Sequence, residues 1–119
     1  MLLSNPPEIQ ALRFGRIVID NVVYNRDVII FPDRVLSNWR RRDGHNLALE
    51  DLVEVLEGNP ETIILGQGVF GRMKVSGDVR EWITERGIEL IVFRTEGARK
   101  AYNELREQRR VIAALHLSC

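Results

Sequence analysis

Three short apolar runs, separated by two segments with helical spacing, constrain the fold of this chain more than any other feature. The runs occupy residues 62–65, 88–93 and 111–117, and each has the length of a buried strand rather than of a helix. Strands that alternate with amphipathic helices are typical of a sheet covered by helices. The order strand, helix, strand, helix, strand therefore predicts an α/β fold.

The helices between these runs have recognisable boundaries. The first is expected to begin at Asp78, with Glu81 three residues later completing a capping pair, and to end at Gly87. The second is expected to begin at Thr95, whose hydroxyl would cap its first turn. Another helix is predicted over residues 47–57, where leucines and valines recur at helical spacing.

An antiparallel element is predicted in the N-terminal third. Residues 16–20 and 22–24 flank the turn-forming Asn21 and are expected to pair as a hairpin. A further strand is predicted at residues 28–31, ended by Pro32-Asp33.

The rest of the chain shows no linker or repeat. Residues 1–13 are expected to form a flexible N-terminal lead-in, and residues 34–46 a long, polar, irregular segment. A chain of 119 residues fits one domain, which we place at residues 14–119.

The composition argues against several classes of partner and location. Seventeen basic residues balance seventeen acidic ones, so no overall field attracts nucleic acid or anionic lipid. No apolar run approaches the roughly 20 residues that a membrane-spanning helix needs. The one cysteine, Cys119, allows no internal disulfide, which is typical of a reducing compartment. A soluble, cytoplasmic protein is therefore expected.

A glycine-rich turn after the first apolar run is one candidate functional site. Gly66, Gly68 and Gly71 follow residues 62–65 directly, and three glycines at this spacing after a strand are typical of a phosphate-cradling loop. The helix that normally anchors such a loop does not follow at once, because residues 72–77 intervene.

Ligands in open α/β sheets bind outside the carboxyl ends of the strands. These ends are expected at Pro32-Asp33, Gly66-Gln67-Gly68 and Arg94-Thr95. The start of the helix at Thr95 favours an anion, and Arg94 adds a positive charge. A crevice for a small anionic ligand is therefore predicted, lined by Gly66, Gln67, Gly68, Arg94 and Thr95. The alternative is that the glycines form a tight turn and Thr95 only caps its helix.

A second candidate site is the run Trp39-Arg40-Arg41-Arg42, followed by His45. Because tryptophan and arginine are enriched in interface hot spots, Trp39, Arg40, Arg41 and His45 are predicted to form a surface for a protein partner. Such residues also stack nucleic-acid bases, but the zero net charge disfavours that function. The alternative is an anchored loop in which Trp39 is packed and the arginines are solvated.

The remaining chemistry-bearing residues form no catalytic or metal-binding pattern. His116 lies in an apolar run and is expected to be buried and satisfied by a backbone group. The histidine and cysteine spacing matches no metal site, and no cofactor is expected. No two carboxylates suggest a catalytic pair. Three aspartates are expected to make local hydrogen bonds at turns: Asp20, Asp27 and Asp33.

Several segments together resemble the Mth938-like domain family. They are Phe14-Gly-Arg-Ile-Val-Ile-Asp20, Trp39-Arg40 with Gly44-His45, Ile64-Leu-Gly-Gln-Gly68, Tyr102-Asn103 and Ala113-Ala-Leu-His-Leu-Ser-Cys119. The resemblance runs from about residue 14 to the end of the sequence. It implies a three-layer fold with a central mixed sheet of about five strands, helices and an additional β-hairpin element.

The resemblance also bears on function. The family includes mitochondrial complex I assembly factor 3 and a cytosolic adipogenesis-associated protein, which implies a protein-partner role at least as readily as catalysis. Gln67 stands where the family often has a small hydroxyl residue. If that hydroxyl carries chemistry in the family, this chain lacks it.

These observations favour a protein-binding or assembly module without enzymatic activity. The alternative is a small-molecule or anion-binding protein, or an enzyme, that uses the crevice between Gly66–Gly68 and Arg94–Thr95. Apolar strands beside a hairpin also leave room for edge-to-edge pairing between two copies of the chain, which would form a homodimer.

Overall fold

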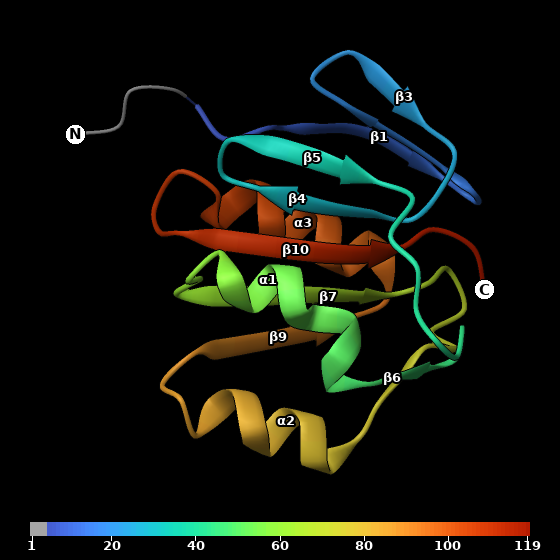
Figure 1. Ribbon diagram of the computed structural model, residues 1–119. Helices are drawn as coiled ribbons and strands as arrows, with labels where there is room; N and C mark the ends of the chain where they lie inside the picture. The colour runs from blue at the N-terminus through green and yellow to red at the C-terminus, as the bar shows by residue number, and fades with distance from the viewer. Residues whose placement is uncertain (1–4) are drawn as a thin grey trace.

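The computed structural model describes residues 5–119, which form three layers (Figure 1). A five-stranded mixed sheet is the middle layer, in the order β5-β4-β10-β7-β9. The strands are β4 (Val28–Phe31), β5 (Arg34–Ser37), β7 (Thr62–Gln67), β9 (Glu89–Phe93) and β10 (Val111–His116). Strands β7, β9 and β10 run parallel to one another, whereas β4 is antiparallel to both β10 and β5. The expected α/β class and mixed central sheet are confirmed.

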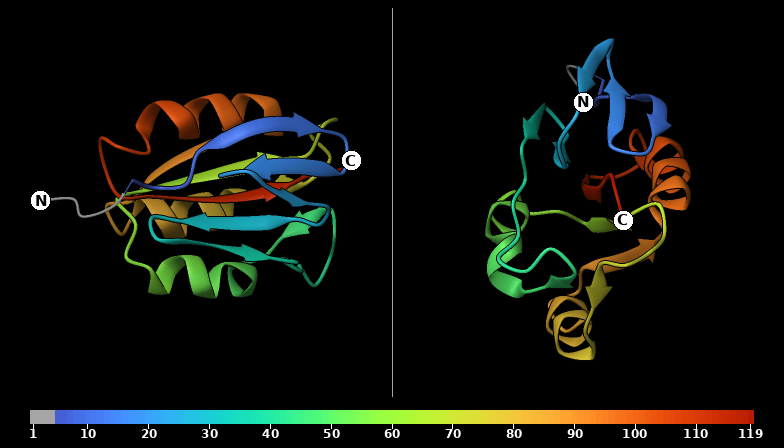
Figure 2. Two further views of the ribbon diagram at one scale, coloured as in Figure 1. Left: turned by 90° about the horizontal axis from the view of Figure 1, so that it is seen from above. Right: turned by 90° about the vertical axis from the view of Figure 1, so that its right-hand side faces the viewer.

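Helices and a second sheet cover the two faces of the central sheet (Figure 2). A 3-10 helix, α1 and α2 pack on one face, while α3 and a three-stranded sheet pack on the other. Their bounds are 3-10 helix η1 (Leu49–Leu52), α1 (Val53–Glu57), α2 (Gly77–Thr84), α3 (Thr95–Leu105), β1 (Ile9–Arg13), β2 (Arg16–Ile19) and β3 (Val22–Tyr24). Two short strands, β6 (Asn46–Leu47) and β8 (Lys74–Val75), form a parallel pair outside these layers.

Successive side chains of the central strands point to opposite faces of the sheet, which explains why both faces are apolar. Ile63 and Leu65 join the cluster under α1 and α2, whereas Ile64 between them joins the cluster under α3. All three are fully buried. Successive side chains of a strand point to opposite faces, so a continuous apolar run fills both cores at once.

The predicted hairpin is confirmed, but it is part of a larger element. Strands β2 and β3 pair antiparallel around Asp20 and Asn21, which have φ of 47° and 67°, as a tight hairpin turn requires. Strand β1 pairs with the other side of β2, so residues 9–13 of the expected lead-in are a strand. The Asn103 side chain fixes that strand to α3, because it accepts from the Ile9 N–H at 3.1 Å and donates to the Ile9 carbonyl at 2.8 Å.

The prediction that residues 34–46 are irregular throughout is wrong. Residues 34–37 form β5 instead, because Pro32 and Asp33 make a tight turn that returns the chain alongside β4. The helix expected over residues 47–57 is also shorter, and its first half is the 3-10 helix η1. The Asp51 carboxylate binds the Ala48 N–H at 2.8 Å and so stabilises a tighter first turn.

Helix α2 begins one residue earlier than expected and with a different cap. The Ser76 hydroxyl accepts from the Val79 N–H at 3.3 Å, so Ser76 is the N-cap and Asp78 lies inside the first turn. The predicted Asp78–Glu81 capping pair is therefore wrong. Among the residues described, no helix has the length and apolar character needed to cross a membrane.

Candidate functional site

The candidate site lies at the edge of the central sheet where β7, β9 and β10 end, which we call the carboxyl edge. Because β4 is antiparallel to β10, it begins at this edge and ends at the opposite one. The prediction that Pro32-Asp33 lies at the carboxyl edge is therefore wrong, and Asp27 lies there instead. Residues 38–46 and the loop at residues 68–73 run across the edge, which faces the viewer in the right-hand view of Figure 2.

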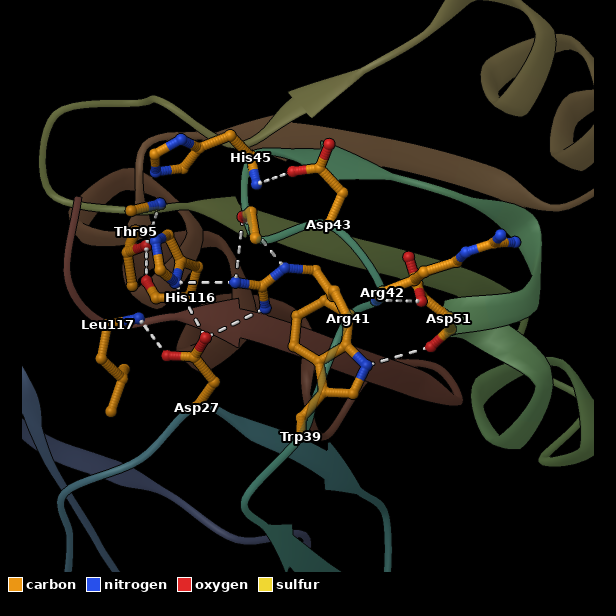
Figure 3. A network of polar contacts seen from close by, with 12 residues as sticks. Asp27, Trp39, Arg41, Arg42, Asp43, His45, Asp51, Thr95, His116 and Leu117 are labelled. Atoms are coloured by element: carbon orange, nitrogen blue, oxygen red, sulfur yellow. Dashed lines mark hydrogen bonds and ion pairs between the residues drawn. The ribbon is translucent and has the colours of Figure 1, made fainter.

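A buried polar network centred on Asp27 occupies the middle of this edge (Figure 3). The carboxylate of Asp27 accepts from the Leu117 N–H at 2.8 Å and from Arg41 Nη1 at 3.0 Å. Its Oδ2 also lies 2.8 Å from Nδ1 of His116. Burial alone would raise the pKa of Asp27, but the hydrogen bonds with His116, Leu117 and Arg41 hold this pKa below its ordinary value.

Arg41 is the second member of the network and is not solvated. Its side chain is 4% exposed, and its guanidinium lies 4.6 Å from the ring centroid of Trp39. The guanidinium also donates to the Gly44 carbonyl from Nε and Nη2, at 3.3 and 3.2 Å. Trp39 in turn donates from Nε1 to the Asp51 carbonyl at 3.0 Å. Residues 39–44 are thus folded around a buried cation.

His116 is buried as expected, but a side chain rather than a backbone group satisfies it. Its Nδ1 lies 2.8 Å from the Asp27 carboxylate and 3.0 Å from Arg41 Nη2. An ionised carboxylate at that distance requires a proton on Nδ1. The other ring nitrogen, Nε2, is buried without a hydrogen-bond partner within residues 5–119. His116 therefore carries one unpaired polar atom in the interior of the part of the chain described.

Thr95 connects the start of α3 to the turn after β7. The N-cap of α3 is Arg94, so the prediction that the Thr95 hydroxyl caps the helix is wrong. That hydroxyl instead accepts from the Gly68 N–H at 2.8 Å and donates to the His116 carbonyl at 2.6 Å. The Thr95 N–H also donates to the Gly68 carbonyl at 3.2 Å. The turn and the helix start therefore meet at one rim, as the crevice hypothesis requires.

The five residues of the predicted crevice differ in accessibility. Gly66 and Gly68 are buried and Thr95 has no exposed surface, so a ligand reaches them only if the surrounding loop moves. Arg94 is exposed, with its stem packed over Gly71. Gln67 is partly buried and donates to the Met73 carbonyl at 3.0 Å. It lines a cavity of about 430 Å³ together with Asn46, Leu47, Lys74, Val75 and Ser76.

The four residues of the predicted partner surface also differ in burial. Trp39 and Arg41 belong to the interior, whereas Arg40 and His45 are exposed. Arg40 lines an open depression of about 420 Å³ whose other walls include Asn25, Arg26, Asn38 and Gly44. The packed tryptophan agrees with the anchored-loop alternative, but the buried Arg41 does not.

Two features of this edge were not identified from the sequence. The sequence predicts Asp27 at a turn, and its position directly before a fully buried strand is the signal of a different role. The sequence also predicts no site at Phe14 or Phe70, although both are large apolar residues beside loop glycines. Their side chains are 57% and 58% exposed, and their ring centroids lie 6.2 Å apart. We call them the Phe14–Phe70 pair.

In the part of the chain that the structure describes, no three His, Cys, Asp or Glu side chains gather as metal ligands. The network can hold a proton and fix loops in place, and Nε2 of His116 is the group that it leaves unpaired among residues 5–119.

Comparisons with known proteins show that the chain is similar to one protein family and to several solved structures. A family model described as a protein of unknown function (DUF498/DUF598) matches residues 9–116. A solved structure named MT938 is 30% identical, with a TM-score of 0.80 over 95% of this chain and 99% of its own. Protein PH1505 of Pyrococcus horikoshii, described as a conserved hypothetical protein, is 24% identical, with a TM-score of 0.81 over 94% of this chain and 99% of its own.

A third structure supports the fold. A Bordetella pertussis protein described as a Mth938-like domain is 20% identical, with a TM-score of 0.66 over 98% of this chain and 92% of its own. At this identity the similarity concerns the fold alone, which matches the Mth938-like architecture implied by the sequence.

Proposed function

We propose that this chain, which belongs to the DUF498/DUF598 family of unknown function, is a protein-binding or assembly-type module that contacts its partner through the carboxyl edge. The Phe14–Phe70 pair carries this proposal. Two large aromatic side chains more than half exposed and in mutual contact are unusual on a monomer surface, where contiguous apolar patches mark interaction sites. Aromatic residues are also enriched in interfaces and their hot spots.

Backbone contacts hold both phenylalanine loops in place, which supports a preorganised surface. The N–H of Gly15, next to Phe14, donates to the Leu117 carbonyl at 2.8 Å. The N–H of Val69, next to Phe70, donates to the Ser118 carbonyl at 2.7 Å. Both loops are therefore fixed to the chain that follows β10. A surface ordered before binding loses less conformational entropy when the partner arrives.

The chemistry of the edge supports binding over catalysis. Asp27, Arg41 and His116 are largely buried and bound to one another. Arg40 and His45 are exposed at the same edge and would form part of a polar rim around the aromatic pair. A single cysteine fits the reducing, cytoplasmic setting that we expect for such a module.

Replacing both phenylalanines with serine tests the proposal. F14S with F70S is expected to reduce capture of the partner by roughly tenfold or more, because hot-spot aromatics contribute most of an interface's energy. The measurement is cross-linking and affinity capture from a lysate, with each partner band quantified against wild type. The matched control is V22S with V53S, whose residues lie on β3 and α1 and are each 49% exposed.

The control variant should retain the partner. Equal loss in both double variants would indicate a general loss of folding or of surface apolarity. Undiminished capture by F14S with F70S would show that the Phe14–Phe70 pair is not the contact.

A second candidate function is the binding of a small anion at the crevice of Gly66, Gln67, Gly68, Arg94 and Thr95. The observation that favours it is the buried Nε2 of His116, which has no partner among residues 5–119 and whose ring lies beside Gly68. A small anion would accept a hydrogen bond from Nε2 if this nitrogen carried a proton and the loop at residues 68–73 opened.

This second candidate predicts a ligand-dependent rise in melting temperature. In a thermal-shift screen of inorganic phosphate, nucleotides and carboxylates, at least one compound should stabilise the wild type. R94A should abolish the rise, whereas R34A at the opposite edge of the sheet should not. A screen in which no compound stabilises the wild type, or in which R94A keeps the full rise, would count against the crevice.

A further inference from the structure

Four arginines with exposed side chains lie in or against the two loops that carry Phe14 and Phe70. Arg13 and Arg16 flank the turn that carries Phe14, and they pair across β1 and β2. Arg72 follows Phe70 in the same loop, and the side chain of Arg94 packs on Gly71 in that loop. Among residues 5–119, none of the four forms an ion pair with a carboxylate.

Two acidic side chains in neighbouring segments, Glu96 and Asp43, do not compensate for this charge. Glu96, which follows Thr95 in α3, is bound by Arg99. Asp43, in the segment that crosses the edge, accepts from the His45 N–H at 3.0 Å and from the Asn46 amide at 2.9 Å. The chain as a whole is neutral, so acidic residues in other segments of the sequence match these arginines. Residues 49–57 of η1 and α1 contain four acidic residues and no basic one: Glu50, Asp51, Glu54 and Glu57.

A hollow that Arg13 and Arg16 line gives the surface a shape as well as a charge. Arg13, Arg16, Ala11, Leu12 and Val18 line a cavity of about 170 Å³ on the outer face of β1 and β2. Apolar walls with two guanidinium groups at the rim suit an apolar side chain that has carboxylates next to it. A concave site of this size fits a side chain of a partner protein better than the flat surface of a bilayer.

We propose that the partner presents an acidic segment with apolar anchor residues, which contact the Phe14–Phe70 pair while its carboxylates pair with Arg13, Arg16, Arg72 and Arg94. This inference rests on the proposed function and specifies the chemistry of the partner. The aromatic rings supply the apolar contact, and the four arginines supply steering and orientation. Arginine suits this role because its planar fork binds a carboxylate through two hydrogen bonds.

A pair of synthetic peptides tests the charge requirement directly. One is a fluorescein-labelled amphipathic helix with glutamates on its polar face and leucines on the other, and the second has lysines in place of the glutamates. The acidic peptide is expected to bind wild type and the lysine peptide is not. Binding should weaken from about 50 mM to about 500 mM salt, because exposed charges are screened. R13E with R16E should weaken it roughly tenfold, as should R72E with R94E.

Three further measurements separate the outcomes. R34E at the opposite edge is the control variant and should leave peptide binding unchanged. Vesicles of phosphatidylserine should not sediment the protein in an arginine-dependent way, and sedimentation velocity should show no self-association that the arginine variants abolish. Vesicle binding or self-association of that kind, without peptide binding, would overturn the proposal in favour of a membrane or a second copy.

Different results would contradict this inference and the proposed function. If F14S with F70S loses the captured partner while high salt and the acidic peptide do not affect capture, the surface binds a protein but not through acidic groups. If the phenylalanine variant keeps every partner, the proposed function itself is wrong. Circular dichroism of each variant identifies any that fails to fold.

Discussion

Replacing Asp27 with asparagine is expected to lower the free energy of unfolding by about 3 kcal/mol, because it breaks a buried ion pair and leaves one partner charged. The asparagine side chain has one acceptor oxygen, whereas Asp27 accepts from Arg41, His116 and the Leu117 N–H. The Arg41 side chain is 4% exposed and cannot regain its hydration without moving. The measurement is urea denaturation, in which the midpoint should fall with little change in slope.

Asp33 provides the matched control. It pairs with Arg34 at 3.1 Å, but the two side chains are 71% and 59% exposed. D33N is therefore expected to change the free energy of unfolding by less than about 1 kcal/mol. Equal effects of D27N and D33N would mean that the Asp27 network contributes little to stability.

The effect of D27N should also depend on pH. The pKa of Asp27 is lower in the folded protein than its ordinary value of 3.8. The carboxylate therefore contributes its full stabilisation above that value and loses it as the pH falls through the folded-state pKa. The difference between wild type and D27N should be constant near neutral pH and should shrink below pH 3.8. A difference that stays the same in acid would contradict the assignment of Asp27 as the stabilising charge.

Gly68→Ala is expected to destabilise the protein by about 3 kcal/mol, the second large effect at this edge. Gly68 has φ of 100°, where a side chain is strained. A Cβ would also lie 2.5 Å from the backbone carbon of Cys119 and 2.7 Å from Cδ2 of His116. The substitution therefore pushes the turn away from the chain that it packs on. Thermal and urea denaturation measure the loss.

Gly87→Ala is the control for backbone strain alone. Gly87 has φ of 76°, but a Cβ there would meet no atom within 4 Å. G87A is expected to cost roughly 1–2 kcal/mol, the penalty for the left-handed conformation without a steric clash. If G68A cost no more than G87A, the close approach at Gly68 would not constrain the turn.

The fold class could be predicted because its signals are local. Residues 62–65 and 111–117 are apolar at nearly every position, which is typical of strands covered on both faces, and both were found as strands. Asp20 and Asn21 mark a turn through their own conformational preferences. Short elements such as β5 and β6 were missed, because two to four residues carry too little periodicity to stand out from a polar loop.

The candidate site was predictable only in part, because its contacts join distant segments. The sequence located Gly68 and Thr95 correctly at one rim, since both follow central strands that run parallel. It did not reveal that Asp27 and His116 meet, because 89 positions separate them and their pairing depends on β4 running antiparallel to β10. Nor did it distinguish the buried Arg41 from the exposed Arg40, because adjacent residues in an irregular segment follow no period.

The sequence by itself determined which segments form most of the strands and helices and that they build a helix-covered α/β sheet. Only the tertiary structure decided that Arg41 lies in the interior and that the Phe14–Phe70 pair lies on the surface. The physical reason is that hydrophobic periodicity reports which side of an element avoids water, but not which other element covers that side. The meeting of polar side chains is decided by strand order and direction, which depend on contacts between residues far apart in the chain.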